Sequence, residues 1–252
     1  MNTIARSFLI ALLCLFTLPA GALAKEKPVD YNNRGIAKKD KGDLDGAIAD
    51  YDRAIQINPK YDSAYNNRGS AKQDKGDLDG AIADYDRAIQ INPKYDMAYK
   101  NRGLANTKKR NWADALADYR HTCELNEKGQ DYPRLYIWLL RARLAETDAA
   151  GKELSAFLDK RGNAAPGDWI STVGGFLLGT LAEEKLFAAA SSPDAKKESE
   201  QKCDAWFYAG MKKLLAGDRT AAAEYFRKCM ATEQKAFNEY KLAEAELKAL
   251  AP

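Results

Sequence analysis

The sequence predicts an all-α fold, a solenoid of stacked helical hairpins. Residues 31–62 and 65–96 are nearly the same string of thirty-two residues, offset by thirty-four positions, and a looser third copy begins at Tyr99. A repeat of roughly 20–50 residues is typical of stacked supersecondary units, and this period suits two antiparallel helices with their turns. The composition agrees, because the 252 residues are 46% hydrophobic and 30% charged, with a mean hydropathy of −0.54.

The first 24 residues have the features of a cleaved secretory signal. Arg6 precedes an apolar stretch, residues 8–18, which is followed by Pro19 and by the small-residue site Ala-Leu-Ala at 22–24. We therefore predict cleavage after Ala24 and a periplasmic or secreted mature chain.

Two other fates of this segment are disfavoured. A retained membrane anchor is disfavoured because the apolar stretch is much shorter than the ~20 residues that cross a bilayer. A lipid on Cys14 is disfavoured because the bulky Leu13 precedes it inside the apolar stretch. The expected mature chain begins at Lys25, is free of the membrane and lacks a stable membrane insertion.

The charge balance disfavours a nucleic-acid partner. Removing the leader takes away Arg6 and no acid, so the formal net charge falls from +3 to +2. Nucleic-acid binding relies on clustered Lys and Arg, whereas the lysines of these repeats alternate with aspartates. We read this pattern as a solvated protein surface.

Each repeat carries the signals of a helix, a turn and a second helix. Gly35 and Gly69 lie near the middle of the first helices, where a missing side chain lets two helices approach closely. On the second helices Ala47 is followed four residues later by Tyr51, and Ala81 by Tyr85, so each small–large pair shares one helical face. The pairs Gly42-Asp43 and Gly76-Asp77 provide a residue free to adopt positive φ and then a helix-capping carboxylate. Asn58-Pro59 and Asn92-Pro93 end the second helices.

At these positions the repeats resemble the tetratricopeptide repeat (TPR) family. The family's signature positions are matched by Tyr31, Gly35, Ala47, Tyr51, Ala54 and Pro59 and by Tyr65, Gly69, Ala81, Tyr85, Ala88 and Pro93. The resemblance implies a right-handed superhelical α-solenoid whose concave wall is lined by the first helix of each repeat. Three repeats are expected over residues 25–131, the third with Thr122 in place of the usual alanine.

Charged residues stand at several positions where the family favours apolar ones. Arg34, Arg68 and Arg102 replace a leucine, and Lys38 and Lys72 replace a large aromatic residue. We expect their stems to lie along the apolar seam with their charged heads in water, and the packing between repeats to be looser as a result.

Residues 132–252 are predicted to remain helical. Helical runs are expected at about 134–145, 149–160, 169–178 and 181–190, with a turn at 162–167. A divergent hairpin over about 203–236 repeats the spacing of the repeats through Trp206, Gly210, Gly217-Asp218, Ala222 and Phe226, and a capping helix follows at 237–250. The order of these tail elements resembles the NlpI type of envelope TPR lipoprotein.

Positions that differ between the repeats indicate a peptide-binding groove. Residues 31–62 and 65–96 differ only at Ile36 against Ser70 and at Lys39 against Gln73, which share one face of the first helix. Paired asparagines can bond a peptide backbone, Ile36 and Leu104 offer apolar contacts, and lysines attract acids. The predicted groove consists of Asn32, Asn33, Ile36, Lys39, Asn66, Asn67, Ser70, Gln73, Lys100, Asn101, Leu104 and Thr107.

Two qualifications accompany this groove. A recent duplication that drifted at exposed, tolerant positions explains two differences equally well. A clamp for a C-terminal carboxylate, which some family members build from Lys and Arg over three repeats, is disfavoured. The matching positions are Asn32, Ile36, Asn67, Met97 and Asn101, and of these only Asn67 keeps the expected type.

Catalysis, cofactors and metals find little support. His121 is the single histidine, and a lone histidine is more often a surface or packed residue than a general base. No second histidine is present to complete a zinc pair. An enzyme with a site at Glu183 and Glu184 is the alternative, but no spacing assigns them acid and base roles.

The three cysteines of the mature chain suggest one disulfide. Cys203 lies fourteen residues before Gly217 and Cys229 twelve after it, so the two reach similar heights on opposing arms of one hairpin. A bridge is expected in an oxidising compartment, the alternative being two small buried residues at helix contacts. Cys123 is either buried or available for an intermolecular bond.

These observations predict a non-enzymatic, extracytoplasmic adaptor or scaffold that binds peptide segments or envelope proteins in its concave groove. The NlpI-type resemblance implies cell-wall hydrolases or an envelope protease as partners, and a homodimer. The alternative is a structural protein whose repeats mediate self-assembly. No cofactor is expected.

Overall fold

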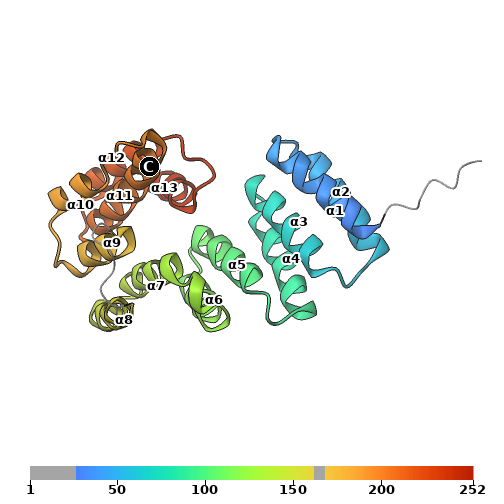
Figure 1. Cartoon of the computed structure of the whole chain (residues 1–252), viewed down its shortest axis with the longest axis horizontal. Helices are drawn as coiled ribbons and strands as arrows, with labels where there is room; N and C mark the ends of the chain where they lie inside the picture. The colour runs from blue at the N-terminus through green and yellow to red at the C-terminus, as the bar shows by residue number, and fades with distance from the viewer. Residues whose placement is uncertain (1–26, 162–167, 252) are drawn as a thin grey trace, which may run out of the picture.

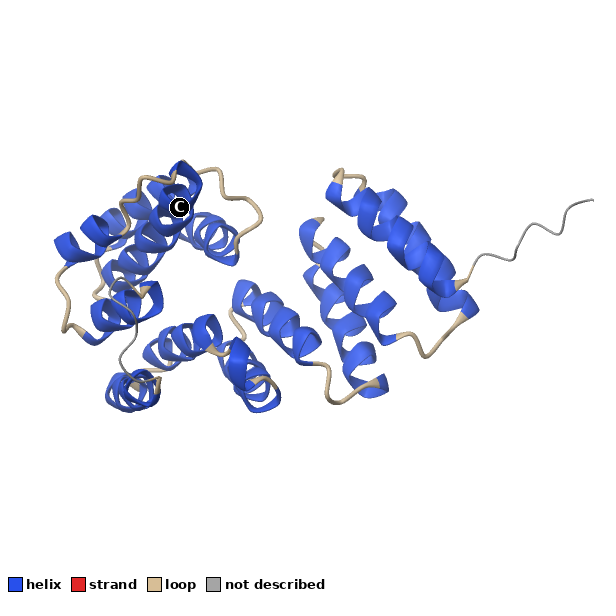
Figure 2. Ribbon diagram, in the orientation of Figure 1, coloured by secondary structure: helices blue, strands red, loops and turns tan. Residues whose placement is uncertain are grey.

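The structure is a computed structural model that describes residues 27–161 and 168–251. These ranges hold thirteen α-helices, one short 3-10 helix and no strand, which confirms the predicted all-α class (Figure 2). The expected signal segment, residues 1–24, and the expected turn at 162–167 lie outside the described residues.

Six helices build the repeated half of the chain. They are α1 (Pro28–Asp40), α2 (Leu44–Ile57), α3 (Asp62–Asp74), α4 (Leu78–Ile91), α5 (Asp96–Lys109) and α6 (Trp112–Leu125). The remaining elements are η1 (Glu127–Gly129), α7 (Asp131–Arg143), α8 (Thr147–Lys160), α9 (Trp169–Leu178), α10 (Glu183–Ala189), α11 (Ala195–Leu215), α12 (Arg219–Met230) and α13 (Asn238–Leu250).

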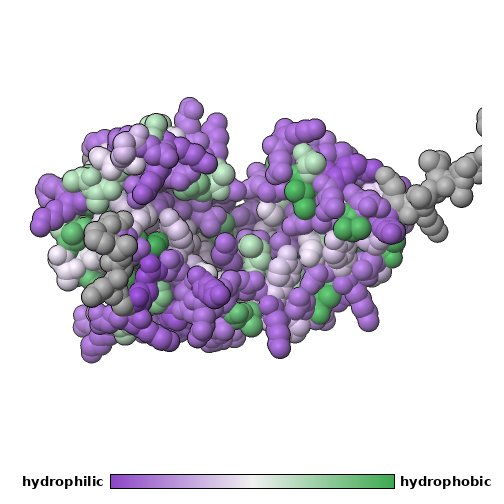
Figure 3. Space-filling model, viewed as in Figure 1, coloured by the Kyte–Doolittle hydropathy of each residue, from purple (hydrophilic) through white to green (hydrophobic). Residues whose placement is uncertain are grey.

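The helices follow one curved path (Figure 1). α1–α6 form one arm, α7 and α8 form the bend, and α9–α13 form a second arm. Successive helices pack against each other along the solenoid, and α13 returns to contact α5. The space-filling view shows a notch between the two arms, on the side away from α7 and α8 (Figure 3). The C-terminal helix therefore lies inside the curve of the repeats.

Close contact between a glycine and an aromatic ring holds each hairpin together. A Cβ atom added to Gly35 would lie 2.6 Å from Cε1 of Tyr51, and one added to Gly69 would lie 2.8 Å from the same atom of Tyr85. Gly42 and Gly76 have φ of +83° and +88°, a conformation that favours glycine. Asp43 then caps α2 by accepting a hydrogen bond from the Gly46 amide, at 2.9 Å.

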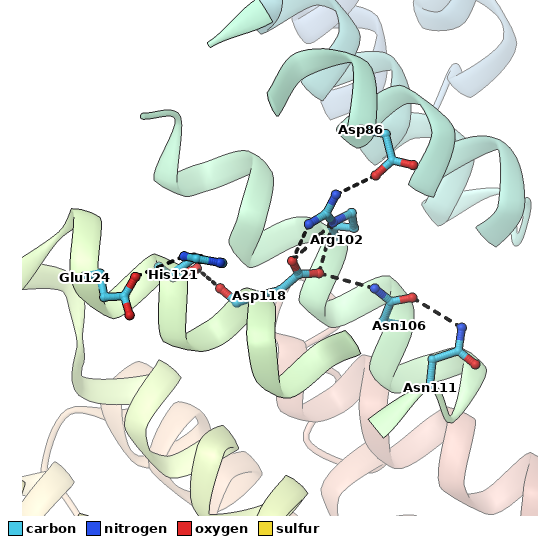
Figure 4. Close-up of polar contacts among 8 residues, drawn as sticks. Asp86, Arg102, Asn106, Asn111, Asp118, His121 and Glu124 are labelled. Atoms are coloured by element: carbon cyan, nitrogen blue, oxygen red, sulfur yellow. Dashed lines mark hydrogen bonds and ion pairs between the residues drawn. The ribbon is translucent and has the colours of Figure 1, made fainter. Parts of the chain in front are cut away.

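The arginines at 34, 68 and 102 correct our expectation of charged heads in water. Arg68 donates from Nε to Asp84 at 2.9 Å and from Nη1 to Asp52 of the preceding repeat, and Asp84 is only 4% exposed. Arg102 repeats this arrangement with Asp118 and Asp86 (Figure 4). Arg68 and Arg102 thus join the two helices of their own hairpin to the hairpin before it, whereas Arg34 joins α1 to Asp50 of α2 within the first hairpin.

The lysines at 38 and 72 also bind acids rather than extending into water. Lys38 Nζ lies 2.8 Å from Asp50, and Lys72 Nζ lies 2.8 Å from Asp84. In the third repeat Asn106 takes the lysine's place and donates to Asp118 at 3.2 Å (Figure 4). The two aspartates differ in pKa: the Arg34 hydrogen bond leads the effects that hold the pKa of Asp50 below its usual value, whereas burial raises the pKa of Asp118 against the opposing effects of Arg102 and Asn106.

The tail contains the largest hydrophobic core of the described residues. This core extends from Leu104 in α5 to Ala243 in α13 and includes most of α7, with Leu135, Ile137 and Leu139 all buried. In contrast, the cores between the first three repeats are small clusters built around Tyr51 and Tyr85. The buried apolar core is therefore larger in the C-terminal half of the chain than in the first repeats.

One hairpin of the tail reproduces the packing of the repeats. A Cβ atom on Gly210 would lie 2.7 Å from Cε1 of Phe226, Gly217 has φ of +86°, and Asp218 caps α12 by accepting from the Ala221 amide. α11 differs in length, since it begins at Ala195, eight residues before the hairpin expected from the sequence. In its extra N-terminal turns Ser199 donates to the Thr232 carbonyl, at 3.3 Å, and accepts from the Gln234 amide, at 2.9 Å.

The last helix is fixed by buried acids. Glu239 is 3% exposed and accepts hydrogen bonds from the hydroxyls of Tyr136, at 2.5 Å, and Tyr208, at 3.2 Å. Two turns after Glu239, Glu246 pairs with Arg110 and Arg143. These contacts join α13 to α5, α7 and α11 at once.

The first repeat has a polar outer edge. Asp30 of α1 is exposed at the position where Ala64 and Ala98 of the later repeats are fully buried against the preceding hairpin. Ala37 is likewise exposed, whereas its equivalent Ala71 is fully buried. The array therefore begins with a charged residue where an internal repeat has a methyl group.

Candidate partner-binding surface

The first helices of the repeats line the inside of the curve. α1 contacts α3 and α3 contacts α5, while the second helices within the described ranges make no contacts of similar extent. α13 shows which side of these helices faces inward: Asp74 of α3 meets Lys241, and Thr107 of α5 lines a cavity of about 20 Å³ together with Leu242 and Glu246. We call this side of α1, α3 and α5 the inner face.

The twelve residues of the predicted groove divide by exposure. Four are buried, namely Asn32, Asn66, Gln73 and Leu104. Two are exposed, Asn33 and Ile36, and the other six are half-buried, namely Lys39, Asn67, Ser70, Lys100, Asn101 and Thr107. The accessible part of the prediction is therefore centred on α1 and α3.

The paired asparagines bond each other across repeats. Asn67 donates from Nδ2 to Oδ1 of Asn32, and Asn101 donates to Oδ1 of Asn66, both at 3.0 Å. This ladder corrects the expectation that both asparagines of a pair face the groove. A buried amide is stable only when hydrogen-bonded, and the neighbouring repeat supplies that bond. Asn32 and Asn66 thus fix the stacking of α1, α3 and α5.

The two positions that differ between the first repeats lie in different surroundings. Gln73 is 6% exposed and accepts a hydrogen bond from the hydroxyl of Tyr85 at 3.3 Å, so it belongs to the core. Its counterpart Lys39 reaches across to Asp74, 3.2 Å away. Ile36 is 39% exposed on the inner face, and contact of its apolar side chain with water is unfavourable in free energy.

The third repeat contributes less to the accessible surface, because the chain covers it. Leu104 is 4% exposed and belongs to the same core as Leu242 of α13. Lys100 was predicted to attract acids, and the acid it influences is the chain's own Glu239, whose burial raises the pKa while Lys100 acts in the opposite direction. α13 thus occupies the C-terminal part of the inner face.

Two apolar residues of the inner face were missing from the predicted groove. Val29 is 43% exposed and Met97 is 42% exposed, at equivalent positions of the first and third repeats. Val29 precedes Ile36 by two helical turns, so the two side chains lie on one stripe of α1. This spacing was present in the sequence, but the comparison of repeats drew attention only to positions that differ between the first two.

The residues considered for catalysis are held in ordinary surface contacts. His121 is exposed, its Nδ1 lies 3.0 Å from Glu124 (Figure 4), and its ring packs beside Tyr99. Glu183 accepts a hydrogen bond from the Tyr225 hydroxyl at 2.6 Å and pairs with Lys213, while Glu184 is exposed.

The described ranges contain neither a cluster of metal-ligating side chains nor a helix that could span a membrane. No group of three or more His, Cys, Asp or Glu side chains there could hold a metal ion. None of the helices in these ranges has the length and apolar character required to cross a membrane.

The cysteines lie in the interior. The Sγ atoms of Cys203 and Cys229 are 3.4 Å apart, on facing turns of α11 and α12, and both residues are fully buried as free thiols. The predicted bridge therefore stays a prediction for oxidising conditions. Cys123 is 3% exposed, and burial raises the pKa of its thiol to about 11, which makes it a packed residue rather than a reactive one.

Stacked helical hairpins with an accessible inner face define the class of α-solenoid repeat proteins. Within that class, residues 35–95 match tetratricopeptide repeat family models. A family model described as "TPR repeat" matches residues 35–76, and one described as "Tetratricopeptide repeat" matches residues 63–95. No curated protein sequence matches the chain.

Solved structures share this fold. A tetratricopeptide repeat protein from Parabacteroides merdae is 23% identical, with a TM-score of 0.58, over 91% of this chain and 87% of that one. The first TPR domain of Spaghetti (RPAP3), bound to an HSP90 peptide, is 24% identical over 47% of this chain and 94% of that one, with a TM-score of 0.46. The Arabidopsis OM64 TPR domain is 25% identical over 45% and 93%, with a TM-score of 0.43.

Proposed function

We propose that the chain is an adaptor that binds a segment of another protein on the inner face of α1, α3 and α5. TPR repeats typically serve as interaction modules without catalytic activity. The observation that carries the proposal is the apolar stripe of Val29, Ile36 and Met97, each about two-fifths exposed on the inside of the curve. Exposed apolar groups that share a concave surface favour binding over solvation.

The geometry also favours a narrow, extended or helical ligand. The inner face is open over α1 and α3, and it is limited at α5 by α13. Ser63 and Ser70 of α3 lie at the positions equivalent to Val29 and Ile36, so small polar side chains separate the apolar ones. A segment with apolar side chains at intervals and free backbone groups between them suits this surface.

A charge placed on the inner face tests the proposal. Peptides enriched from a random display library on the purified protein serve as probes, with affinity measured by fluorescence anisotropy. Ile36→Glu is expected to weaken binding by about tenfold or more, because a carboxylate replaces an apolar contact at the centre of the stripe. Ile57→Glu is the matched control, since Ile57 is 49% exposed at the end of α2, outside the inner face. Failure to enrich any peptide, or equal loss in both variants, would overturn the proposal.

We also propose that the adaptor acts outside the cytoplasm, on cell-wall hydrolases or an envelope protease, and as a homodimer. The support is the apolar leader at residues 1–24 and the NlpI-type order of the tail, both of which are sequence features. Mass spectrometry of the chain from its producing cells is expected to give Lys25 as the first residue. An N-terminus that retains residues 1–24 would contradict export by cleavage.

A further inference from the structure

Three lysines from three helices meet near one aspartate on the inner face. Lys39 of α1 and Lys241 of α13 pair with opposite oxygens of Asp74, at 3.2 and 2.8 Å. Lys108 of α5 stands at the repeat position equivalent to Asp74 and is close enough for Lys241, Asp74 and Glu244 to influence its charge. The cluster lies where α13 meets the repeats, and we call it the lysine junction.

Lys108 has no counter-ion of its own. Among the described residues it makes no ion pair or side-chain hydrogen bond, although it is half-buried. Burial lowers the pKa of its ammonium, and the neighbouring Lys241 lowers it further. Lys39 and Lys241 meanwhile share a single carboxylate, whose side chain is 22% exposed. The junction therefore holds three ammonium groups against Asp74 and the more distant Glu244.

This excess of positive charge is adjacent to the apolar stripe. Ile36 precedes Lys39 by one helical turn on the same side of α1. The positions of the lysines also differ from those at which family members clamp a C-terminal carboxylate, where this chain has Asn32, Ile36, Asn67, Met97 and Asn101. A partner segment that lies along Ile36 would therefore place a carboxylate within reach of the lysine junction.

We propose that the lysine junction binds an aspartate or glutamate side chain of the partner segment, next to an apolar residue that contacts Ile36. This inference rests on the proposed function and names the chemistry of its partner. The incoming carboxylate pairs with Lys108 and competes with Asp74 for Lys39 and Lys241. Charge-assisted pairs of this kind are stronger than neutral hydrogen bonds and give specificity as well as affinity.

Blocked peptides test the inference. The enriched peptides are synthesised with an acetylated N-terminus and an amidated C-terminus, each in an acidic form and with Glu or Asp replaced by Gln or Asn. The neutral Gln or Asn forms are also made with a free C-terminus. Binding is measured with the wild-type protein and with Lys108→Ala, Asp74→Asn and Lys152→Ala, the last being a control at an exposed lysine of α8.

The acidic forms are expected to bind the wild-type protein about tenfold more tightly than the amide forms. Lys108→Ala is expected to abolish that difference. Asp74→Asn is expected to strengthen binding of the acidic forms several-fold, because it removes the competing carboxylate. A purely structural role for the junction predicts no gain from Asp74→Asn, which makes this variant the discriminating one.

Three results would overturn the inference. If acidic and amide forms bind equally, the lysine junction has no role in recognition, but the proposed binding of a partner segment on the inner face is not contradicted. If neutral peptides with a free C-terminus bind better than blocked acidic ones, the occupant is a chain end and not a side chain. If no blocked peptide binds and Ile36→Glu changes nothing, the proposed function fails together with the inference.

Discussion

The two arms of the molecule are stabilised by different interactions. In the first arm, α1–α6, hairpins are joined by arginine–aspartate pairs, an asparagine ladder and small clusters around Tyr51 and Tyr85. In the bend and the second arm a single apolar core connects α7 to α13 and extends back to Leu104. The hairpins of α1–α6 therefore behave as separate modules, each stabilised by its neighbours, whereas α7–α13 form one cooperative unit.

The largest expected effect is on the free energy of unfolding, and it distinguishes a cooperative core from an array of modules. Phe226→Ala removes a fully buried ring from the large core, and we expect it to lower the free energy of unfolding by about 4 kcal/mol. Tyr51→Ala at the equivalent position of the first repeat is expected to open α1 and α2 locally and to leave the main transition in place. Urea unfolding followed by circular dichroism, with hydrogen exchange of α1 and α2, measures both. An equal loss of the main transition in the two variants would contradict the modular description.

Oxidation is expected to stabilise only the second arm. A bridge between Cys203 and Cys229 closes a loop within the α11–α12 hairpin and is expected to add about 3 kcal/mol to the unfolding free energy. Peptide mass mapping after incubation with oxidised and reduced glutathione detects the bridge, and Cys229→Ser is the control. Separate free thiols at the two positions under oxidising conditions would refute the prediction.

Removing one arginine is expected to weaken the junction between two repeats. Arg68→Ala leaves the buried Asp84 with Lys72 alone and removes the bond to Asp52, so we expect a loss of about 2 kcal/mol. Arg53→Ala, at an exposed arginine that bonds Gln56 within α2, is the control and should stay within about 0.5 kcal/mol of the wild type. Equal stability of both variants would show that the arginine pairs contribute little.

The smallest expected effect is an opposite response of the two arms to pH. Burial raises the pKa of Glu239, so its share of stability is present at low pH and is lost as pH rises through that raised pKa. The Arg34 hydrogen bond is the main cause of the lowered pKa of Asp50, so its share is lost as pH falls below the usual carboxyl range.

Hydrogen exchange of α1–α2 and of α11–α13 at acidic and neutral pH is expected to show these opposite slopes. Glu239→Gln should flatten the slope of the second arm and Asp50→Asn that of the first, because neither amide titrates. Parallel slopes in the two arms of the wild-type protein would contradict the assignment.

Local signals in the sequence were enough to predict the hairpins. Gly35, the pair Ala47 and Tyr51, Gly42 with Asp43, and the 34-residue period specify helix, turn and stacking from short-range spacing. The same logic identified the tail hairpin through Gly210 and Phe226. These features recur because each depends on neighbours at a fixed, short separation.

Contacts of long sequence separation could not be predicted in the same way. Lys241 and Asp74 are 167 residues apart, and no period relates them. The covering of Leu104 by the core that contains α13 depends on how far the whole arc bends, which a repeat pattern does not specify. The arginine–aspartate pairs could have been predicted, because an arginine and an aspartate sixteen residues apart recur in each repeat, as Arg34 and Asp50 do in the first.

The exposed Asp30 has a consequence for how copies of the chain meet. Because two repeats are nearly identical, an uncharged first edge would match the surface that α3 presents to α2, and α1 of one copy could take the place of α3 against α2 of another copy. A carboxylate that would be buried without a counter-ion opposes such an exchange between copies. A single negative charge at the start of the array thus sets where the stack of repeats begins.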